Sequence, residues 1–493
     1  MSGAAKPVAM QASATFKGND RLLLGIIMGV VAFWLFAQTT LNIAPDMQRE
    51  LGMDSNTMNI AVAITSLFSG IFIVVMGGLA DRVGRLKITK IGFYLNIAGS
   101  LLVAITPSGE LATPVMLAGR ALQGLSAACI MPASLALVKA YWDGAERQRA
   151  ISMWSIGSWG GSGLCALFGG MMNEAFGWRS IFWVGIAVSL IGLWLMRGTP
   201  ESKAETQGAY KFDLPGVLTF MTTMIALQVL VTQGARIGLT SPAGLALIAV
   251  TAVFGWLFYR VEMKSANAFF DFGLFKNSTF TGATISNFLI NGTAGTLIVS
   301  LQLVQLGGNM NAQQAGMLTL GYAIAIIAFI RVGEKLLQRF GPRKPMIWGC
   351  LITGLSIVLL MPSHLMVGQY RVLAIVAYSL FGVGLAFYAT PSTDAALSNL
   401  PAAQAGSGAG IYKMASSLGA AFGVAISAAI FTALRGDNEG IRWLEGVITF
   451  VGRQDNLAVR EAAMIALGFN VLMVAMAILS IMLTVPSGKK VEA

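Results

Sequence analysis

The chain has 493 residues, of which 56% are hydrophobic and only 11% are charged. A soluble globular protein carries roughly 25% charged residues, so this composition leaves too little polar surface to face water. The net charge of +11 would suit a nucleic-acid-binding protein, but the basic residues cluster in short loops between apolar spans. We therefore expect a membrane-embedded protein without a nucleic-acid partner.

The sequence argues against a cleaved signal peptide, a disulfide framework and a metal site. Polar residues precede the first apolar span and no cleavage site follows it, which indicates a retained helix. Cys129, Cys165 and Cys350 all fall inside apolar spans, and their number is odd, so neither a disulfide framework nor a metal site is expected. With His364 as its single histidine, the chain cannot supply a histidine cluster. No metal and no cofactor are predicted.

Apolar stretches of membrane-spanning length recur along the whole chain. A bilayer core of ~30 Å needs about 20 apolar residues per helix, and such spans must be helical because lipid offers no partners to the backbone. The sequence predicts fourteen of them, at 22–44, 58–79, 89–106, 114–140, 150–172, 181–197, 213–234, 242–262, 279–304, 313–333, 346–362, 372–396, 406–433 and 463–485.

Lysine and arginine set the orientation of these spans. If the N-terminus is cytoplasmic, most basic residues fall on the inside. Four basic residues of the other side lie in one long loop, Arg435, Arg442, Arg453 and Arg460, and no other outside loop has more than one. We therefore expect both termini to be cytoplasmic.

The spans group into two related blocks. The predicted organisation is a cytoplasmic tail (1–21), a six-helix bundle (22–200), two inserted transmembrane helices (201–265), a second six-helix bundle (266–486) with an outside loop at 435–462, and a cytoplasmic tail (487–493). The loop GLADRVGRLK after the second helix resembles KLLQRFGPRK after the tenth, with Gly84 matching Gly341. Internal repeats of this kind are typical of transporters.

The first of these loops carries the pattern G-x-L-A-D-R-x-G-R, from Gly77 to Arg85. It resembles the signature loop of the major facilitator superfamily, which in that family latches the two halves together on the cytoplasmic side. Glycine permits tight turns, and a carboxylate is favoured at a helix N-terminus. The resemblance implies a gating group, namely Gly77, Asp81, Arg82, Gly84, Arg85 and, on the thirteenth helix, Lys413. The alternative is an ordinary basic loop. In the second copy, Gln338 replaces the acid.

Further segments resemble a narrower branch of that family. They are FGWRSIF, KFDLPG, DFGLFKN, NFLINGTAGTL, RVGEKLLQ, YATPSTD and GIYKMAS. They are similar to segments of the fourteen-helix drug:proton antiporters, and among these to multidrug and quinolone efflux pumps. The resemblance implies an all-α integral membrane protein with the major facilitator fold and 14 transmembrane helices arranged 6+2+6.

Proton coupling needs a group that gains and loses a proton, and no acid falls near the middle of a predicted span. Asp46, Glu334 and Asp394 lie nearest to a helix interior, each close to a predicted end, and we expect one of them to carry the proton. Lys413 is expected to partner Asp394 or Asp81 electrostatically. The alternative for Glu334 and Asp394 is a structural ion pair at the cytoplasmic gate.

Arg120 is a charge inside the fourth span, which indicates function by default. The stretch LAGRALQGLSAA around it resembles the family's helix-4 motif, in which the arginine is implicated in proton transfer. Arg120 is therefore a fourth coupling candidate. The alternative is a side chain that snorkels to the outer face.

Polar and aromatic residues on otherwise apolar helices suggest a broad, adaptable substrate path. The candidates are Trp34, Gln38, Asn42, Gln123, Trp154, Ser155, Asn287, Asn291, Gln302 and Tyr388. The fifth span, GSWGGSGLCALFGG, resembles the antiporter motif of drug exporters, although Cys165-Ala166 stands where Gly-Pro is commoner. Its expected helix-packing residues are Gly157, Gly161, Gly169 and Gly170. Simple packing without a special function is the alternative.

No G-x-x-x-x-G-K-[ST] loop occurs, so an ion gradient rather than ATP should drive transport. We expect a non-enzyme that exports hydrophobic drug-like compounds in exchange for protons across the bacterial cytoplasmic membrane, functioning as a monomer. Its partners are small-molecule substrates, protons and the bilayer. Two alternatives remain, an exporter or importer of one endogenous metabolite and a non-transporting membrane sensor or scaffold.

Overall fold

A computed structural model describes residues 16–204, 213–265, 268–310, 312–435, 448–452 and 454–487. These residues form helices and no strand. Twelve of the helical stretches are long and apolar enough to cross a bilayer. The predicted all-α, multi-pass membrane architecture is therefore confirmed for the part of the chain that is described.

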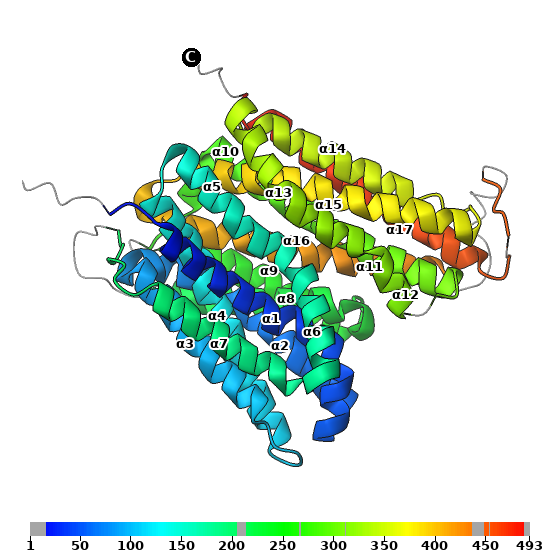
Figure 1. The fold of residues 1–493 in the computed structure, drawn as a ribbon, viewed down its shortest axis with the longest axis horizontal. Helices are drawn as coiled ribbons and strands as arrows, with labels where there is room; N and C mark the ends of the chain where they lie inside the picture. Colours follow the sequence, from blue (N-terminus) through cyan, green and yellow to red (C-terminus); the bar gives the residue numbers. More distant parts are fainter. Residues whose placement is uncertain are drawn as a thin grey trace, which may run out of the picture.

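The N-terminal bundle and the inserted hairpin come first in the chain (Figure 1). The bundle comprises α1 (Asp20–Leu51), α2 (Ser55–Val83), α3 (Arg85–Ala104), α4 (Ala112–Tyr141), α5 (Gly144–Ser155), the π-helical turn η1 (Ile156–Gly160), α6 (Gly161–Phe176) and α7 (Arg179–Leu195). The inserted hairpin comprises α8 (Leu214–Ile237) and α9 (Pro242–Glu262).

The C-terminal bundle follows in the chain. It comprises η2 (Phe272–Lys276), α10 (Ser278–Gly292), α11 (Gly295–Gln302), the π-helical turn η3 (Leu303–Gly307), α12 (Ala312–Leu318), α13 (Leu320–Phe340), α14 (Arg343–Leu360), α15 (Val367–Ser398), η4 (Ala402–Gln404), α16 (Ala405–Leu434) and α17 (Leu457–Thr484).

Two predicted spans differ from the other twelve. The fifth is built from α5, η1 and α6, which follow one another without a break. The sixth is α7, which at 17 residues is shorter than the roughly 20 residues that span a bilayer. The count of fourteen transmembrane helices therefore stays a prediction at these two positions.

Several helices run beyond their apolar windows. The first was predicted to end at residue 44, but α1 continues through Pro45 to Leu51. The tenth was predicted to end at residue 333, but α13 continues to Phe340. A helix does not stop where its side chains become polar, because charged side chains near a helix end reach the membrane surface. Asp46 and Glu334 consequently lie inside helices rather than beside their ends.

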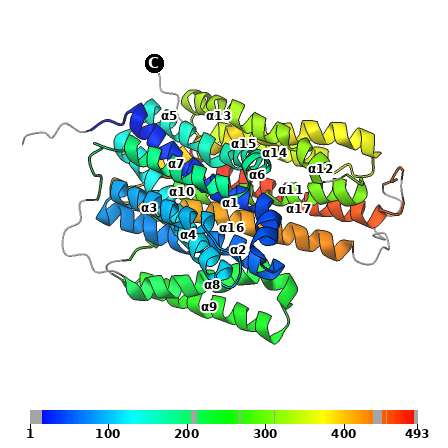
Figure 2. The same ribbon diagram turned by 60° about the horizontal axis from the view of Figure 1, so that its bottom comes forward.

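The two bundles lie close together at one end of the molecule, and their ribbons spread apart toward the other (Figure 1). Between them, α16 packs against α2 and α4, while α13 and α15 pack against α5. The pair α8 and α9 lies along one side and contacts the bundles through α2 and α16 (Figure 2). We call the closed end, which contains the α2–α3 turn, the latched end.

The two halves share a local feature that explains their related loops. Gly84 ends α2 with φ 134°, and Gly341 ends α13 with φ 73°. Both values lie in a region that side chains with a Cβ rarely adopt, so glycine is required at each turn. The predicted match of Gly84 with Gly341 thus corresponds to equivalent helix ends.

Candidate functional site

Asp81 joins the two bundles at the latched end. Its carboxylate is buried, with a relative exposure of 3% for the residue. The backbone N–H groups of Gly406 and Ser407, at the start of α16, donate to its two oxygens at 2.8 and 2.9 Å. Arg85 donates to the same carboxylate through Nε (3.0 Å) and Nη2 (2.8 Å). A buried anion is thereby paired with both a cation and a helix N-terminus.

The predicted gating residues gather around this carboxylate. Arg85 also donates to the carbonyl of Ala402 in the other bundle. The backbones of Gly77 and Gly406 touch, because a Cβ on Gly77 would lie 2.3 Å from the Gly406 carbonyl oxygen. Asp81 therefore contacts the first turn of α16. Arg82 donates to the carbonyl of Ala268, at 2.7 Å.

A second set of contacts joins the bundles beside the latch. Lys139, near the end of α4, donates to the carbonyls of Leu397 and Leu400. Arg147 of α5 forms a salt bridge with Asp394 of α15 at 3.5 Å. Gln148 donates to the same carboxylate at 3.5 Å, and Ser398 donates to it at 3.0 Å. Asp394 is thus a buried carboxylate that connects the two halves.

Glu334 has a different environment. It is 4% exposed, and its contacts come from its own helix, with Arg331 in an ion pair and Gln338 donating at 3.2 Å. Gln338, which occupies the position of the missing acid in the second copy of the loop, is used in this contact. The pairing is local to α13, unlike that of Asp394.

Lys413 lies where the bundles meet, eight residues into α16 rather than near its start. The prediction that it partners Asp394 or Asp81 is wrong, because those carboxylates pair with Arg147 and Arg85. Instead its Nζ donates to Ser158 of η1 at 3.2 Å and sits 5.0 Å from the ring centroid of Trp154. Among the described residues no salt bridge involves Lys413. Its ammonium group faces an aromatic ring and a hydroxyl across the interface.

Aromatic residues continue this interface. Trp159 of η1 meets Tyr388 of α15 edge to face, with ring centroids 6.5 Å apart. Trp154 is fully buried and donates through Nε1 to Ser134 at 3.0 Å, so this hydrogen bond fixes the ring that faces Lys413. Among the described residues, the buried Nε1 of Trp34 and Oγ of Ser155 have no hydrogen-bond partner.

The C-terminal half contributes a connected polar network. Ser286 and the hydroxyl of Tyr388 are 2.7 Å apart, and Ser392 donates to that hydroxyl at 3.0 Å. Asn287 donates to the carbonyl of Tyr412 at 2.9 Å, and Asn291 donates to the side-chain oxygen of Asn287 at 2.8 Å. Asn287 is fully buried, so its first role is to hold helices together. Gln302 ends α11, immediately before η3.

Arg120 is enclosed within the N-terminal bundle. It is 1% exposed, which excludes the snorkelling alternative. Its donors reach the carbonyls of Ala61 (3.1 Å) and Phe36 (2.9 Å), the hydroxyl of Thr40 (3.1 Å) and Oε1 of Gln123 (2.8 Å). All four acceptors are neutral.

Gln123 extends this hydrogen-bond network to α3, because it donates to Ser100 at 3.0 Å. It is fully buried within the N-terminal bundle. Gln123, a predicted substrate-path residue, is therefore part of the Arg120 network inside the N-terminal bundle.

Asp46 lies at the end of α1 opposite the latch. It forms an ion pair with Arg49, and Asn173 donates to it at 2.5 Å. Its side chain is 36% exposed. The structure thus places Asp46 at the far mouth of the N-terminal bundle, away from Glu334 and Asp394. The side chains of Gln38 and Asn42, on the same helix, lie outside the described part.

The glycines of the fifth span differ in what they pack against. A Cβ on Gly157, Gly161 or Gly169 would lie 3.2, 2.5 or 2.4 Å from Val30, Trp34 or Thr39 of α1. A Cβ on Gly170 would meet nothing within 4 Å, so its expected role in close helix packing is wrong. Gly160 was not predicted, yet a Cβ there would lie 2.6 Å from Ile327 of α13.

Sequence reasoning also missed η1 and the residues Lys139, Arg147 and Ser158. A π-helical turn leaves no mark in hydropathy, although the run of small residues from Gly157 to Gly161 is compatible with close packing. Lys139 and Arg147 were counted only among the basic residues of the cytoplasmic side. Their partners come from a segment more than 200 residues away.

Comparisons with known proteins agree with this architecture. The sequence profile of the Major Facilitator Superfamily matches residues 23–424 and, in a second overlapping match, 280–490. Quinolone resistance protein NorB of Staphylococcus aureus strain MRSA252 is 48% identical over 417 residues, covering 85% of this chain and 89% of that protein. NorB of strain MSSA476 is 49% identical over 420 residues, covering 84% and 89%.

Solved structures share the fold at low sequence identity. The proton:xylose symporter XylE bound to 6-bromo-6-deoxy-D-glucose superposes with a TM-score of 0.63 at 16% identity, covering 95% of this chain and 96% of that chain. The human organic anion transporter MFSD10 (TETRAN) gives 0.57 at 15% identity, covering 93% and 98%. With its profile match, its close relatives and its paired helical bundles, the chain belongs to the major facilitator superfamily of membrane transporters.

Proposed function

We propose that the protein exports hydrophobic drug-like compounds, such as quinolones, dyes and biocides, across the cytoplasmic membrane in exchange for protons, and that it works as a monomer. The relatives with 48–49% identity are named for quinolone resistance, which supports this substrate class. Both chain ends would be cytoplasmic, as the basic loops predict. The latched end would then be the cytoplasmic side.

One observation carries the proposal. The hydrogen bonds of Asp81, Arg85, Lys139 and Arg147 join the two bundles at one end, while the ribbons separate toward the other (Figure 1). A transporter that alternates between two sides needs such a joint, which breaks on one side when the other closes. This arrangement corresponds to a state that is shut on the latched side.

The substrate site would lie between the bundles, around Lys413, Trp159 and Tyr388. Aromatic rings offer apolar surface to planar ring systems, and unpaired polar atoms fix orientation. Lys413 adds a cation with no carboxylate partner among the described residues. A carboxylate-bearing amphiphile, the chemistry of quinolones, would complement that charge.

Coupling to protons would involve a carboxylate, with Asp394 as the leading choice. It is buried and bridges the bundles through Arg147, so a change in its charge would act directly on the joint. Glu334 and Asp46 remain in the proposal, the first because it is buried near Arg149, the second because it lies at the far mouth. Arg120 would affect proton coupling indirectly, through its hydrogen bonds to four neutral acceptors in the N-terminal bundle.

Accumulation of a fluoroquinolone or a fluorescent dye, in cells with and without the gene and with and without an uncoupler, tests this function. We expect lower accumulation in cells that express the protein, and loss of that difference with the uncoupler. Unchanged accumulation of every compound would contradict drug export and would favour transport of a single metabolite or a sensor role. A difference that survives the uncoupler would contradict proton coupling alone.

Proton release from the purified protein on addition of drug separates the candidate carboxylates. We expect Asp394→Asn to release fewer protons than the wild type, with Asp46→Asn and Glu334→Gln as parallel variants. Normal release by all three variants would show that none of these acids carries the proton.

A further inference from the structure

Two carboxyl groups meet at the base of the inserted hairpin. Asp213 precedes α8 and accepts a hydrogen bond from the backbone N–H of Gly216 at 3.0 Å, so it caps that helix. Glu262 is the last residue of α9. The two residues are only 7% and 4% exposed. The hairpin therefore closes on a pair of acids that are almost wholly removed from water.

Their side chains face each other across Gly216. A Cβ on Gly216 would lie 2.2 Å from Oε1 of Glu262 and 2.7 Å from Oδ2 of Asp213, so both oxygens flank the same point. Among the described residues, those two buried oxygens have no hydrogen-bond partner. Two acceptors that face each other repel unless one of them holds a proton.

The charged groups around the pair do not replace that proton. Arg82 of α2 is the cation that acts on Glu262, and it donates to the carbonyl of Ala268. Arg260 and Lys264 line a shallow surface hollow beside Asp213. None of these three side chains donates a hydrogen bond to the two oxygens that face each other.

The pair also connects to the latch through a short segment, residues 268–270. Phe270 donates its backbone N–H to Oε2 of Glu262 at 3.2 Å. The carbonyl of Phe269 accepts from the hydroxyl of Ser407 at 3.1 Å, and Ser407 donates its backbone N–H to Asp81. Three steps of hydrogen bonding thus lead from the acid pair to the carboxylate that joins the two bundles.

We propose that Asp213 and Glu262 form a proton-binding site that holds one shared proton and braces the inserted hairpin against the latch. The proton comes from water at the latched end and returns to it. When it leaves, two negative charges face each other in a buried place, Glu262 moves from Phe270, and segment 268–270 loosens its contact with Ser407. The proton site stands independently of drug efflux, whereas its effect on the latch rests on the proposed function.

Infrared difference spectroscopy of the full-length protein in lipid nanodiscs, between acidic and alkaline buffer, tests the proton site directly. We expect a protonated-carboxyl C=O band in the wild type that is present in acidic buffer and disappears in alkaline buffer. The band should be missing in Glu262→Gln and in Asp213→Asn. Asparagine caps helices as well as aspartate does, so Asp213→Asn keeps the start of α8 intact.

Glu146→Gln is the matched control, because Glu146 is an exposed acid in the first turn of α5. It should leave the band unchanged. A wild-type spectrum without this band, or a band that persists in both pair variants, would overturn the proposal. Thermal stability that rises with added Na⁺ or Mg²⁺ in the wild type but not in Glu262→Gln would also overturn it, because the pair would then hold a metal cation.

Thermal unfolding as a function of pH gives a second readout. Because the shared proton removes repulsion in the folded state, wild-type stability should fall as the pH rises and the proton is lost. Glu262→Gln replaces the proton with a permanent amide donor and should flatten this dependence. Equal pH dependence in the variant and the wild type would contradict the shared proton even if drug efflux is normal.

Discussion

A single carboxylate at the latched end, Asp81, accepts two backbone N–H groups from the other bundle and two donors from Arg85. Backbone donors at a helix start are fixed in direction, so the bonds form only when α16 is docked in one register. The hydrogen bonds of the Asp81 carboxylate therefore depend on the relative position of the two bundles. Its charge matters because the same N–H groups interact more weakly with a neutral acceptor.

Asp81→Asn should lower the efflux rate while leaving the protein inserted and folded. The amide retains one acceptor oxygen but presents N–H groups to donors, and a loss of ~1.5 kcal/mol would change the ratio of the two states about tenfold. Efflux by the variant and the wild type should be compared at equal expression. Asp54→Asn is the control, since Asp54 caps the opposite end of α2 and asparagine caps equally well. Unchanged efflux by Asp81→Asn would refute the latch.

Lys413→Met should change which drugs are exported rather than abolish export. Removing the ammonium group deletes the attraction for a carboxylate and the repulsion of a permanent cation, so quinolone efflux should fall relative to efflux of a quaternary dye. We expect the ratio of the two rates to shift roughly tenfold, corresponding to ~1.4 kcal/mol. Lys413→Arg keeps the charge and should keep the preference. An equal fall for both compounds would assign Lys413 a structural role.

At the scale of helices, the fifth span contacts helices of both bundles. Its glycines place it against α1, while Gly160 places it against α13 of the other bundle. The π-helical turn η1 lies between these contacts and presents Ser158 to Lys413. π-helical turns are rare and occur frequently at functional sites. A helix that packs on both bundles at this turn is suited to shift between two arrangements.

Gly161→Ala should destabilise the fold, whereas Gly170→Ala should not. The new methyl on residue 161 would lie 2.5 Å from Trp34, and overpacking of this kind costs about 1–3 kcal/mol. The same substitution at Gly170 meets nothing within 4 Å. Thermal unfolding of the two purified variants in one detergent measures the difference. Equal melting temperatures would mean that α1 and α6 move apart to admit the methyl group at little cost in stability.

How far the sequence predicted these elements depends on the kind of signal. Hydropathy placed the helices because each must bury a long apolar stretch. It placed their ends poorly, as α1 and α13 show, since helices continue past their apolar windows. The acid at Asp81 was predictable from a local pattern. The partner of Lys413 was not, because it lies 255 residues away and is set by the docking of two bundles.

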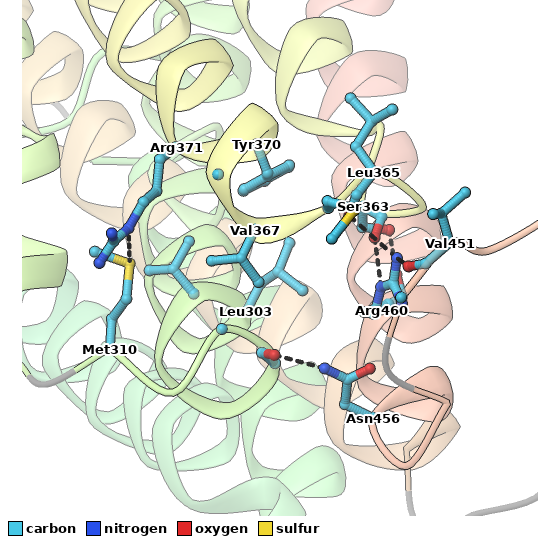
Figure 3. Close-up of a pocket in the computed structure, with 16 residues that line it drawn as sticks. Leu303, Met310, Ser363, Leu365, Val367, Tyr370, Arg371, Val451, Asn456 and Arg460 are labelled. Carbon is cyan, nitrogen blue, oxygen red and sulfur yellow. Dashed lines mark hydrogen bonds between the residues drawn. The ribbon is translucent and has the colours of Figure 1, made fainter.

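At the scale of the molecule, two bundles of related plan are joined at one end and carry a separate hairpin at the side (Figure 2). At the far end, a cavity of about 280 Å³ lies inside the C-terminal bundle, between η3, the start of α15 and the segment before α17. Its lining is largely apolar, with Arg371 and Arg460 among the polar residues (Figure 3). Arg460 donates to the carbonyls of Ser363, Leu365 and Val451, and these hydrogen bonds connect the loops at this end of the bundle.

The orientation of the whole molecule can be tested by cysteine labelling from outside intact cells. Glu110→Cys, in the exposed turn between α3 and α4, should react with a membrane-impermeant maleimide, whereas Lys87→Cys should not. Both native side chains are exposed, so access to water is comparable. The native cysteines are buried and should give little background. Labelling of Lys87→Cys alone would reverse the predicted topology.

The contact between Gly77 and Gly406 makes the joint between the bundles unusually sensitive to size. Each carbonyl oxygen occupies the space that a methyl group on the other residue would need, at 2.3 and 2.4 Å. One methyl added at Gly406 would act as a wedge on the docked arrangement, because its nearest neighbours, Gly77 and Asp81, both belong to the other bundle. Alanine at Gly406 would therefore be a means of trapping the opposite conformation, in which the latched end opens, for direct visualisation.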